Sequence, residues 1–218
     1  MFLGHFAVGF ASKKLAPETN LGWLIAAPIF LDLIWPVFLL LNLEQVKIEQ
    51  GNTAMTPLNF ESYPISHSLV GAIGWSVIFS LLYFSFSKQW RSAIVVGAGV
   101  LSHWVLDAIV HRPDLPLYPG DPDMVGLGLW NSIPGTLLVE GLLFLAGTGI
   151  YWKITRANDR IGSIGFWSFT IFLLLVYIAN VVGPPPESVN ALAGFALIMW
   201  IFPFWAAFFD SHRRVKSI

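Results

Sequence analysis

Six stretches of mostly apolar residues constrain the fold of this chain more than any other feature of its sequence. They cover residues 21–42, 66–87, 92–111, 132–151, 161–182 and 191–209. A helix of about 20 apolar residues crosses the hydrocarbon core of a bilayer. Helices are expected, because backbone groups in lipid must pair within their own segment. We therefore predict an all-α, polytopic membrane helical bundle of about six transmembrane helices, folded as one integral membrane domain over residues 1–218.

Composition supports the same class. Only 11% of the 218 residues are charged and 56% are hydrophobic, whereas a soluble domain has about 25% charged residues. A chain of this size could not bury so much apolar surface in water. The composition therefore excludes a soluble enzyme, a disordered chain and a basic nucleic-acid-binding protein. Cysteine is absent, so disulfides and thiolate ligands are excluded as well.

The first fifteen residues are also apolar and have a helix-like pattern, but the segment is too short to span a bilayer. It could lie in the membrane interface, re-enter the membrane or pack as half a helix within the bundle. Lys13 and Lys14 follow the apolar residues instead of preceding them, so we expect no cleavable signal peptide.

Lysine and arginine are distributed unevenly over the two sides that six spans define. Only Lys47 and Arg112 lie on one side. The other side carries Lys13, Lys14, Lys88, Arg91, Lys153, Arg156, Arg160, Arg213, Arg214 and Lys216. The positive-inside rule predicts that this second side is cytoplasmic and that both termini lie there. The longer loops, residues 43–65 and 112–131, then face outward and are the expected rim of a site. We interpret the turn at residues 183–186 only as a stiff connection.

Acids and histidines are the ionisable residues inside the apolar stretches, and no lysine or arginine lies in a span interior. The set is Asp32, His67, His103, Asp107, His111 and Glu140, with His5 in the N-terminal segment. A charge within a bilayer costs at least about 2.5–3.5 kcal/mol, so it requires a partner or a neutral form. Because no basic side chain is available at this depth, we expect the partner to be a proton or a metal cation.

The spacing of three of these residues favours a shared site. His103, Asp107 and His111 follow one another at intervals of four, so they share one face of a helix over two turns. Imidazole nitrogen and carboxylate oxygen are the ligand set of Zn²⁺, Mn²⁺ or Fe²⁺. We therefore predict a site for a divalent metal, one or two ions, in the middle and outer part of the membrane.

Each residue also has a simpler interpretation. Asp32 could be a protonated acid bonded to a neighbouring helix. Glu140 could join two helices or support a ligand from outside. His111 could be an ordinary histidine of the membrane interface, and His5 a polar residue on an amphipathic segment. We interpret residues 210–212, which end the last span, as a solvated helix end.

Four motifs occur in order along the chain. They are Gly4-His5, Asp32-Leu33-Ile34-Trp35-Pro36, Tyr63-Pro64-Ile65-Ser66-His67-Ser68 and Ser102-His103-Trp104-Val105-Leu106-Asp107. In these motifs the chain resembles the bacterial inner-membrane predicted metal-dependent hydrolases, also described as LexA-binding, membrane-associated hydrolases. The resemblance covers residues 1–151, whereas the two further spans, within residues 161–209, carry no motif. It implies an integral protein of the bacterial cytoplasmic (inner) membrane.

The order of these residues is also similar to that in the all-helical, zinc-dependent phospholipase C family. In that family the matching Asp, His, His and Asp hold one zinc, and the last Asp bridges to a second. The similarity implies that Asp32, His67, His103 and Asp107 hold a first metal, most simply zinc. It also implies that His5 and Asp107 help to hold a second one.

We therefore expect a membrane-embedded, metal-dependent hydrolase that acts on a phosphoester of a lipid or lipid-linked molecule at the extracytoplasmic side. Asp32, Glu140 or Asp114 could be the general base, and Arg112 could hold a phosphate. His111 and Glu140 are further candidates for ligands or for groups that support ligands. The alternatives are a metal-ion or proton transporter or channel that uses the same in-membrane residues, and a non-catalytic membrane partner protein.

Overall fold

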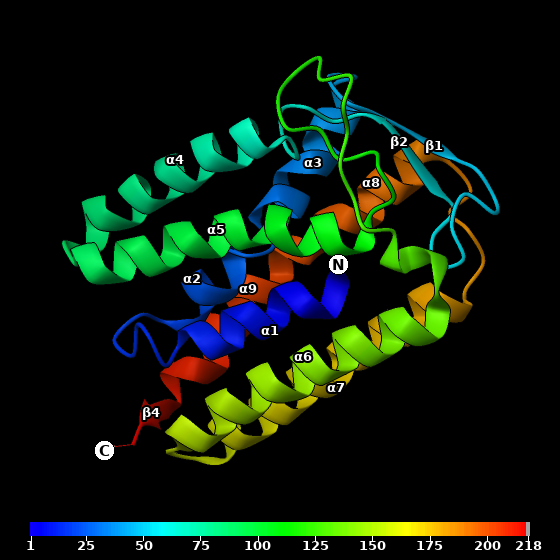
Figure 1. Ribbon diagram of the computed structural model, residues 1–218. Coiled ribbons are helices and arrows are strands. Elements are labelled where there is room, and N and C mark those ends of the chain that lie inside the picture. Colours follow the sequence, from blue (N-terminus) through cyan, green and yellow to red (C-terminus); the bar gives the residue numbers. More distant parts are fainter. Residues whose placement is uncertain (217–218) are drawn as a thin grey trace.

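A computed structural model describes residues 1–216 as a bundle of helices that run close to one common direction (Figure 1). Within the described residues, five helical segments are long and apolar enough to cross a membrane. They are α4 (Leu69–Ser87), α5 (Trp90–Val110), α6 (Ile133–Ile154), α7 (Arg160–Val182) and the continuous run of α8 (Val189–Leu197), η2 (Ile198–Trp200) and α9 (Ile201–Ser211). The predicted all-α, polytopic membrane bundle is confirmed.

The first predicted span, residues 21–42, differs from a continuous helix. It forms α2 (Leu21–Ala26) and α3 (Phe30–Leu40), with a turn at residues 27–29. Pro28 explains the break, because proline lacks the backbone N–H and disfavours helical geometry in the residue before it. The break leaves the carbonyl group of Pro28 free to accept a hydrogen bond from His103.

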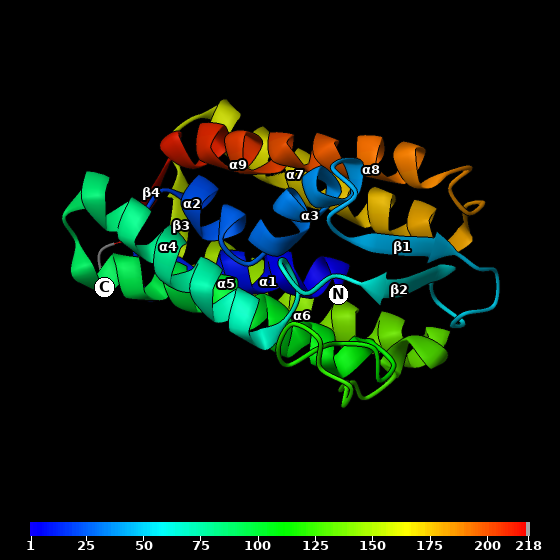
Figure 2. The same cartoon turned by 90° about the horizontal axis from the view of Figure 1, so that it is seen from above.

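Helix α1 (Phe2–Ser12) lies at the centre of the bundle, packed against α2, α5, α6 and α7 (Figures 1 and 2). Leu3, Phe6 and Phe10 are fully buried. Of the three placements that the sequence left open, the half helix within the bundle is therefore the one observed. A side chain at Gly147 of α6 would collide with the backbone of Ala7, so this glycine permits the close approach of the two helices.

One end of the bundle carries most of the basic residues, and we call it the basic end. Strand β3 (Thr155–Ala157) pairs there with β4 (Arg213–Val215). Asp210 is buried and accepts hydrogen bonds from Lys13 Nζ at 2.8 Å and from the Tyr151 hydroxyl at 2.6 Å. The interpretation of Asp210 as a solvated residue is therefore wrong, because α9 packs against α2 and α7 and buries the carboxylate. His212 does remain partly exposed.

The opposite end, which we call the hairpin end, carries both long loops and the turn between α7 and α8 (Figure 2). Residues 43–65 form an antiparallel hairpin of β1 (Gln45–Ile48) and β2 (Leu58–Ser62). The loop of residues 112–131 ends in the short helix η1 (Leu129–Asn131). Ser68 caps α4 by accepting a hydrogen bond from the Gly71 N–H, and this cap fixes where the helix begins.

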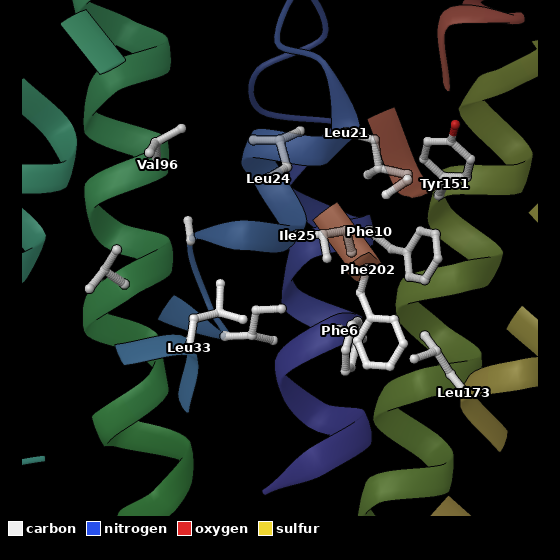
Figure 3. Packing of buried hydrophobic residues seen from close by; sticks show 14 of the residues in the cluster. Phe6, Phe10, Leu21, Leu24, Ile25, Leu33, Val96, Tyr151, Leu173 and Phe202 are labelled. Atoms are coloured by element: carbon white, nitrogen blue, oxygen red, sulfur yellow. The ribbon is translucent and has the colours of Figure 1, made fainter. Parts of the chain in front are cut away.

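Between the two ends lies an apolar core. Phe6 and Phe10 of α1 pack there with Leu24 and Ile25 of α2 and with side chains of α6, α7 and α9 (Figure 3). The outer faces of the long helices are apolar as well, as the exposed Leu81 and Leu142 illustrate. An apolar exterior around an apolar core is expected for a bundle whose solvent is lipid.

Candidate metal centre

Two groups of histidine and aspartate side chains meet inside the bundle, towards its hairpin end. The first contains His5 of α1 with His103 and Asp107 of α5, and the second contains Asp32, His67 and His103. Within each group, one possible ligand atom per residue lies within 4.8 Å of the others. All five residues that the sequence suggested as metal ligands are therefore brought together, from four separate segments.

The carboxylate of Asp107 lies at the centre of this cluster. Its Oδ2 atom is 3.0 Å from His103 Nε2, and its Oδ1 atom is 3.1 Å from His5 Nε2. The Nε2 atoms of His67 and His111 both lie 3.9 Å from Oδ2. The two oxygens of one buried carboxylate thus face different sets of imidazoles, which is the arrangement that a bridging ligand requires.

Asp32 completes the second group from the broken first span. Its Oδ1 atom lies 3.5 Å from His67 Nε2 and 3.7 Å from His103 Nε2. The Nε2 atoms of these two histidines are only 3.2 Å apart. The Asp32 side chain is 30% exposed, whereas the imidazoles of His67 and His103 are buried. Asp32 is therefore the member of this group that is most accessible from outside.

Hydrogen bonds at Nδ1 determine the tautomer of two of these histidines. His103 Nδ1 lies 2.8 Å from the carbonyl oxygen of Pro28, and a carbonyl can only accept, so Nδ1 carries the proton. His67 Nδ1 lies 2.6 Å from Ser66 Oγ, which donates its own proton to the Glu44 carboxylate at 2.6 Å. Ser66 Oγ therefore accepts from His67 Nδ1, and the Nε2 atom of each neutral ring keeps its lone pair.

His111 is held in the same way at the end of α5. Its Nδ1 atom lies 2.9 Å from the Asp114 carboxylate, which also accepts a hydrogen bond from Arg112 Nε at 3.1 Å. Arg112 donates a second bond to Asn59 at 2.6 Å. Burial, together with the nearby Asp114 carboxylate, raises the pKa of Tyr63 well above its usual range, so its hydroxyl stays a donor to the Asp114 carbonyl.

In these tautomers, hydrogen-bond acceptors of the imidazoles face hydrogen-bond acceptors of the carboxylates. The lone pairs at Nε2 of His67, His103 and His111 meet the carboxylates of Asp32 and Asp107 in a largely buried site. Buried acceptors that face one another are costly. Met1 N donates to Asp107 Oδ1, and the remaining lone pairs favour a cation or added protons between them. Imidazoles anchored at Nδ1 by carbonyl and carboxylate groups are typical of zinc ligands. The residues therefore fit a divalent metal.

Glu140 and the start of α1 lie beside the cluster. The Glu140 carboxylate is buried and accepts a hydrogen bond from the Gly4 N–H at 3.4 Å, but it belongs to neither group. The backbone nitrogen of Met1 lies 2.6 Å from Asp107 Oδ1. These contacts hold α1, and with it His5, against α5 and α6 beside the cluster.

A cavity of about 520 Å³ connects the cluster to the hairpin end. Asp32, His67 and Asp107 line its inner part, and residues 50–51 and 53–58 of the hairpin line its outer part. The end of α7 and the turn at residues 183–186 also line it, so the interpretation of that turn as only a stiff connection is wrong. Arg112 lies outside the lining, where Asp114 and Asn59 hold it.

Sequence reasoning missed the groups that orient the histidines. No role was predicted for Glu44, an acid of the loop of residues 43–65, or for Pro28 within the first apolar stretch. A faint signal was present, since Glu44 is the first acid after the stretch that contains Asp32. Tyr177 also went unnoticed, because α7 carries no motif.

The pattern of the YdjM inner membrane protein family matches residues 1–184 of this chain. The match covers all five residues of the cluster and every residue of the cavity lining up to Pro184. No curated protein and no solved structure matches the chain. Because the family match extends over most of the sequence, the chain belongs to the YdjM inner membrane protein family.

Proposed function

We propose that this member of the YdjM inner membrane protein family is a membrane-embedded, metal-dependent hydrolase of a phosphoester in a lipid or lipid-linked molecule. One observation carries the proposal. The lone pairs of His67, His103 and His111 converge on the carboxylates of Asp32 and Asp107 at the inner end of a cavity. A site in which three imidazole lone pairs, each fixed by a hydrogen bond at Nδ1, face two carboxylates favours a cation.

The two oxygens of Asp107 suggest how two ions would be divided. Oδ2 faces His103 and His67, with Asp32 adjacent, so these four residues would hold a first ion. Oδ1 faces His5, so Asp107 and His5 would help to hold a second. This division agrees with the one that the resemblance to zinc-dependent phospholipases implies. A bound divalent metal, zinc by its ligand set, would lower the pKa of bound water and polarise the phosphoryl group.

The chain's own residues supply the remaining chemistry. Asp32 would hold the ion through Oδ1, which faces His67 and His103, so its second carboxylate oxygen is the best candidate for the general base. The side chain is 30% exposed and lines the cavity. Asp114 is a weaker candidate, because His111 and Arg112 both occupy its carboxylate. Glu140 accepts from the Gly4 backbone and is better placed to hold α1 than to accept a proton from water.

The apolar core favours a hydrolase over a transporter or channel. Phe6, Phe10, Leu24 and Ile25 fill the space between the cluster and the basic end, and all four side chains are fully buried (Figure 3). A path for ions needs polar groups or water along its length. A cavity that opens towards the hairpin end and is closed by this core instead supports a site that is reached from one side.

The distribution of basic residues gives the expected side. The positive-inside rule assigns the basic end to the cytoplasm, and the hairpin at the opposite end lines the cavity. We therefore place the reaction at the extracytoplasmic side of the inner membrane, where the hairpin and the 183–186 turn frame the entrance. Membrane lipid and a small lipid or lipid-linked substrate are the implied partners.

Metal analysis of the purified full-length protein tests the proposal. Wild type, prepared without chelators, should hold at least one transition metal per chain, and His103→Ala and Asp107→Ala should lose it. His212→Ala is the matched control, because His212 bonds to Asp159 at the basic end. Less than one ion per wild-type chain would contradict a metal site. Zinc-dependent release of product from a fluorogenic phosphodiester, lost in the same two variants, would separate an enzyme from a metal carrier.

A further inference from the structure

A second pocket, of about 390 Å³, lies at the basic end of the bundle, where α6 ends and α7 begins. Strands β3 and β4 form one part of its wall, and Trp152 and Trp167 form another. Its charged side chains are Arg156, Arg213 and Lys216, and no acid of residues 1–216 lines it. The cavity of the candidate metal centre has the opposite character, with three acids in its wall and no lysine or arginine of the described chain.

The positive charges of this pocket are not neutralised within residues 1–216. The ion pairs that lysine and arginine side chains form there involve Lys13, Lys47 and Arg112. The acids nearest to the pocket residues along the chain, Asp159 and Asp210, are already paired with other side chains. The pocket therefore lacks a counter-ion among the described residues, and an anion would fit it.

The guanidinium group of Arg213 is held in a defined position in the wall. Its Nε and Nη2 atoms donate to the Thr155 hydroxyl at 3.1 and 2.9 Å, and its Nη1 atom donates to the Gly162 carbonyl at 2.8 Å. Its Cζ atom also lies 5.3 and 5.0 Å from the ring centroids of Tyr151 and Phe166. The hydrogen bonds use three of the five N–H groups. A charge fixed before a ligand arrives lowers the cost of binding.

Two arginines lie directly opposite each other on the neighbouring strands. The register of β3 and β4 pairs Arg156 with Arg214, and both side chains are exposed. Like charges in this arrangement destabilise a strand pair. Arg156 lines the pocket, whereas Arg214 does not. An anion in the pocket would therefore offset the charge of Arg156 and relieve the repulsion between the strands.

The uncharged part of the wall indicates a lipid as the source of the anion. Trp152 and Trp167 are 57% and 49% exposed, and tryptophans at the ends of spans are typical of the headgroup region of a membrane. Ser163 and Trp167 line the pocket from one face of α7, which the exposed Ile171 continues. The basic groups thus lie at the end of the spans and the apolar groups lie along them. A free phosphate ion would leave both indole rings without a role.

We propose that this pocket binds the phosphate of an anionic phospholipid, with Arg156, Arg213 and Lys216 around the phosphate and Trp152 and Trp167 against the lipid chains. Basic pockets at the cytoplasmic ends of membrane helices suit such headgroups. On the orientation proposed above, the lipid belongs to the cytoplasmic leaflet. A zwitterionic lipid fits less well, because its ammonium group would meet the three bases. The site lies at the other end of the bundle from the metal centre, and its occupation does not depend on hydrolysis there.

Calorimetric titration of the full-length protein in a nonionic detergent tests this site. The protein is treated with a chelator, so that no metal at the hairpin end binds the phosphate of the probe. The probes are dioctanoyl phosphatidylglycerol, dioctanoyl phosphatidylethanolamine and inorganic phosphate. The glycerol lipid, which is anionic, should bind more tightly than the other two. Inorganic phosphate that binds as tightly as the glycerol lipid would overturn the lipid as the occupant, as would equal or tighter binding of the ethanolamine lipid.

The paired arginines supply a variant and its matched control. Arg156→Gln should weaken binding of the glycerol lipid about tenfold, as expected for the loss of one charge-assisted hydrogen bond. Arg214→Gln removes the same charge from the opposite position, outside the pocket, and should bind like wild type. Equal weakening by both substitutions would mean diffuse attraction to a basic surface. That result would overturn the proposal, as would wild-type affinity of Arg156→Gln.

A second pair of variants makes the same comparison at lysines. Lys216→Gln should also weaken binding of the glycerol lipid about tenfold, whereas Lys153→Gln, at another exposed position of the basic end, should not. His103→Ala should bind this lipid like wild type, because the apolar core separates His103 from the basic end. Loss of lipid binding in His103→Ala would place the lipid at the metal centre and overturn the proposal. A chain that holds no metal but shows the expected order of affinities would contradict the hydrolase and support this site.

Discussion

The imidazole rings of His5 and His103 stack face to face, with centroids 3.9 Å apart and planes 4° apart. His5 belongs to a short helix that cannot span a bilayer, and His103 belongs to one of the long helices. The stacking places the Nε2 atoms of both rings on the carboxylate of Asp107. The cluster therefore depends on where α1 packs as much as on the spacing within α5.

Close packing of α1 on α6 can be tested at a glycine. Gly147→Ala would drive a methyl group into the backbone of Ala7, and we expect a loss of about 1–3 kcal/mol in unfolding free energy, as for other overpacked sites. Gly149→Ala is the matched control, because a Cβ atom there meets open space. Thermal unfolding in detergent should show destabilisation by the first substitution only. Equal stability of both variants would contradict the tight α1–α6 contact.

The outer anchor of His67 should control metal affinity. Glu44→Gln weakens the bonds that hold Ser66 and, through it, His67 Nδ1. Loss of such a support typically lowers metal affinity about 10–100-fold. Competition for zinc with a chelating dye measures the effect, and Glu49→Gln, at an exposed position of the hairpin, serves as control. If Glu44→Gln binds zinc as tightly as wild type, the hydrogen bonds from Glu44 through Ser66 do not orient His67 as a ligand.

Metal should stabilise the fold through the same cluster. Zinc that binds only the folded state adds about 2.7 kcal/mol when its free concentration is 100 times the dissociation constant. We therefore expect zinc to raise Tm in wild type and a chelator to lower it, because chelation leaves acceptors facing one another. His103→Ala should respond to neither. An unchanged Tm of wild type over a wide range of zinc concentration would argue against binding in this cluster.

The buried ion pair at the basic end is a separate determinant of stability. Lys13→Met leaves the Asp210 carboxylate buried without its cation, and breaking such a pair costs about 3–5 kcal/mol. Lys14→Met is the control, because Lys14 is exposed. Chemical unfolding should show that Lys13→Met is strongly destabilised and that Lys14→Met is hardly affected. Comparable stability of the two would mean that the Lys13–Asp210 pair contributes little.

The sequence predicted only part of the candidate site. The interval of four between His103 and Asp107 is a local property of one helix, so their shared face follows from the sequence. The contribution of Asp32 and His67 was suggested by depth and by resemblance, and the structure brings them together. Arg112 and Asp114 were expected to act on substrate or water, but they bond to each other and to neighbours. Such pairings depend on loop conformation, which no periodicity encodes.

The sequence by itself determined the class of this protein. Long apolar stretches dictate membrane helices, since the bilayer sets their length, and the uneven distribution of basic residues predicts their orientation. Only the tertiary structure decided that Pro28 breaks the first stretch and frees a carbonyl for His103, and that α1 lies inside the bundle. It also decided that α7, which has no motif, supplies a wall of the cavity. These features arise from packing between segments distant in sequence, and a linear pattern does not contain that information.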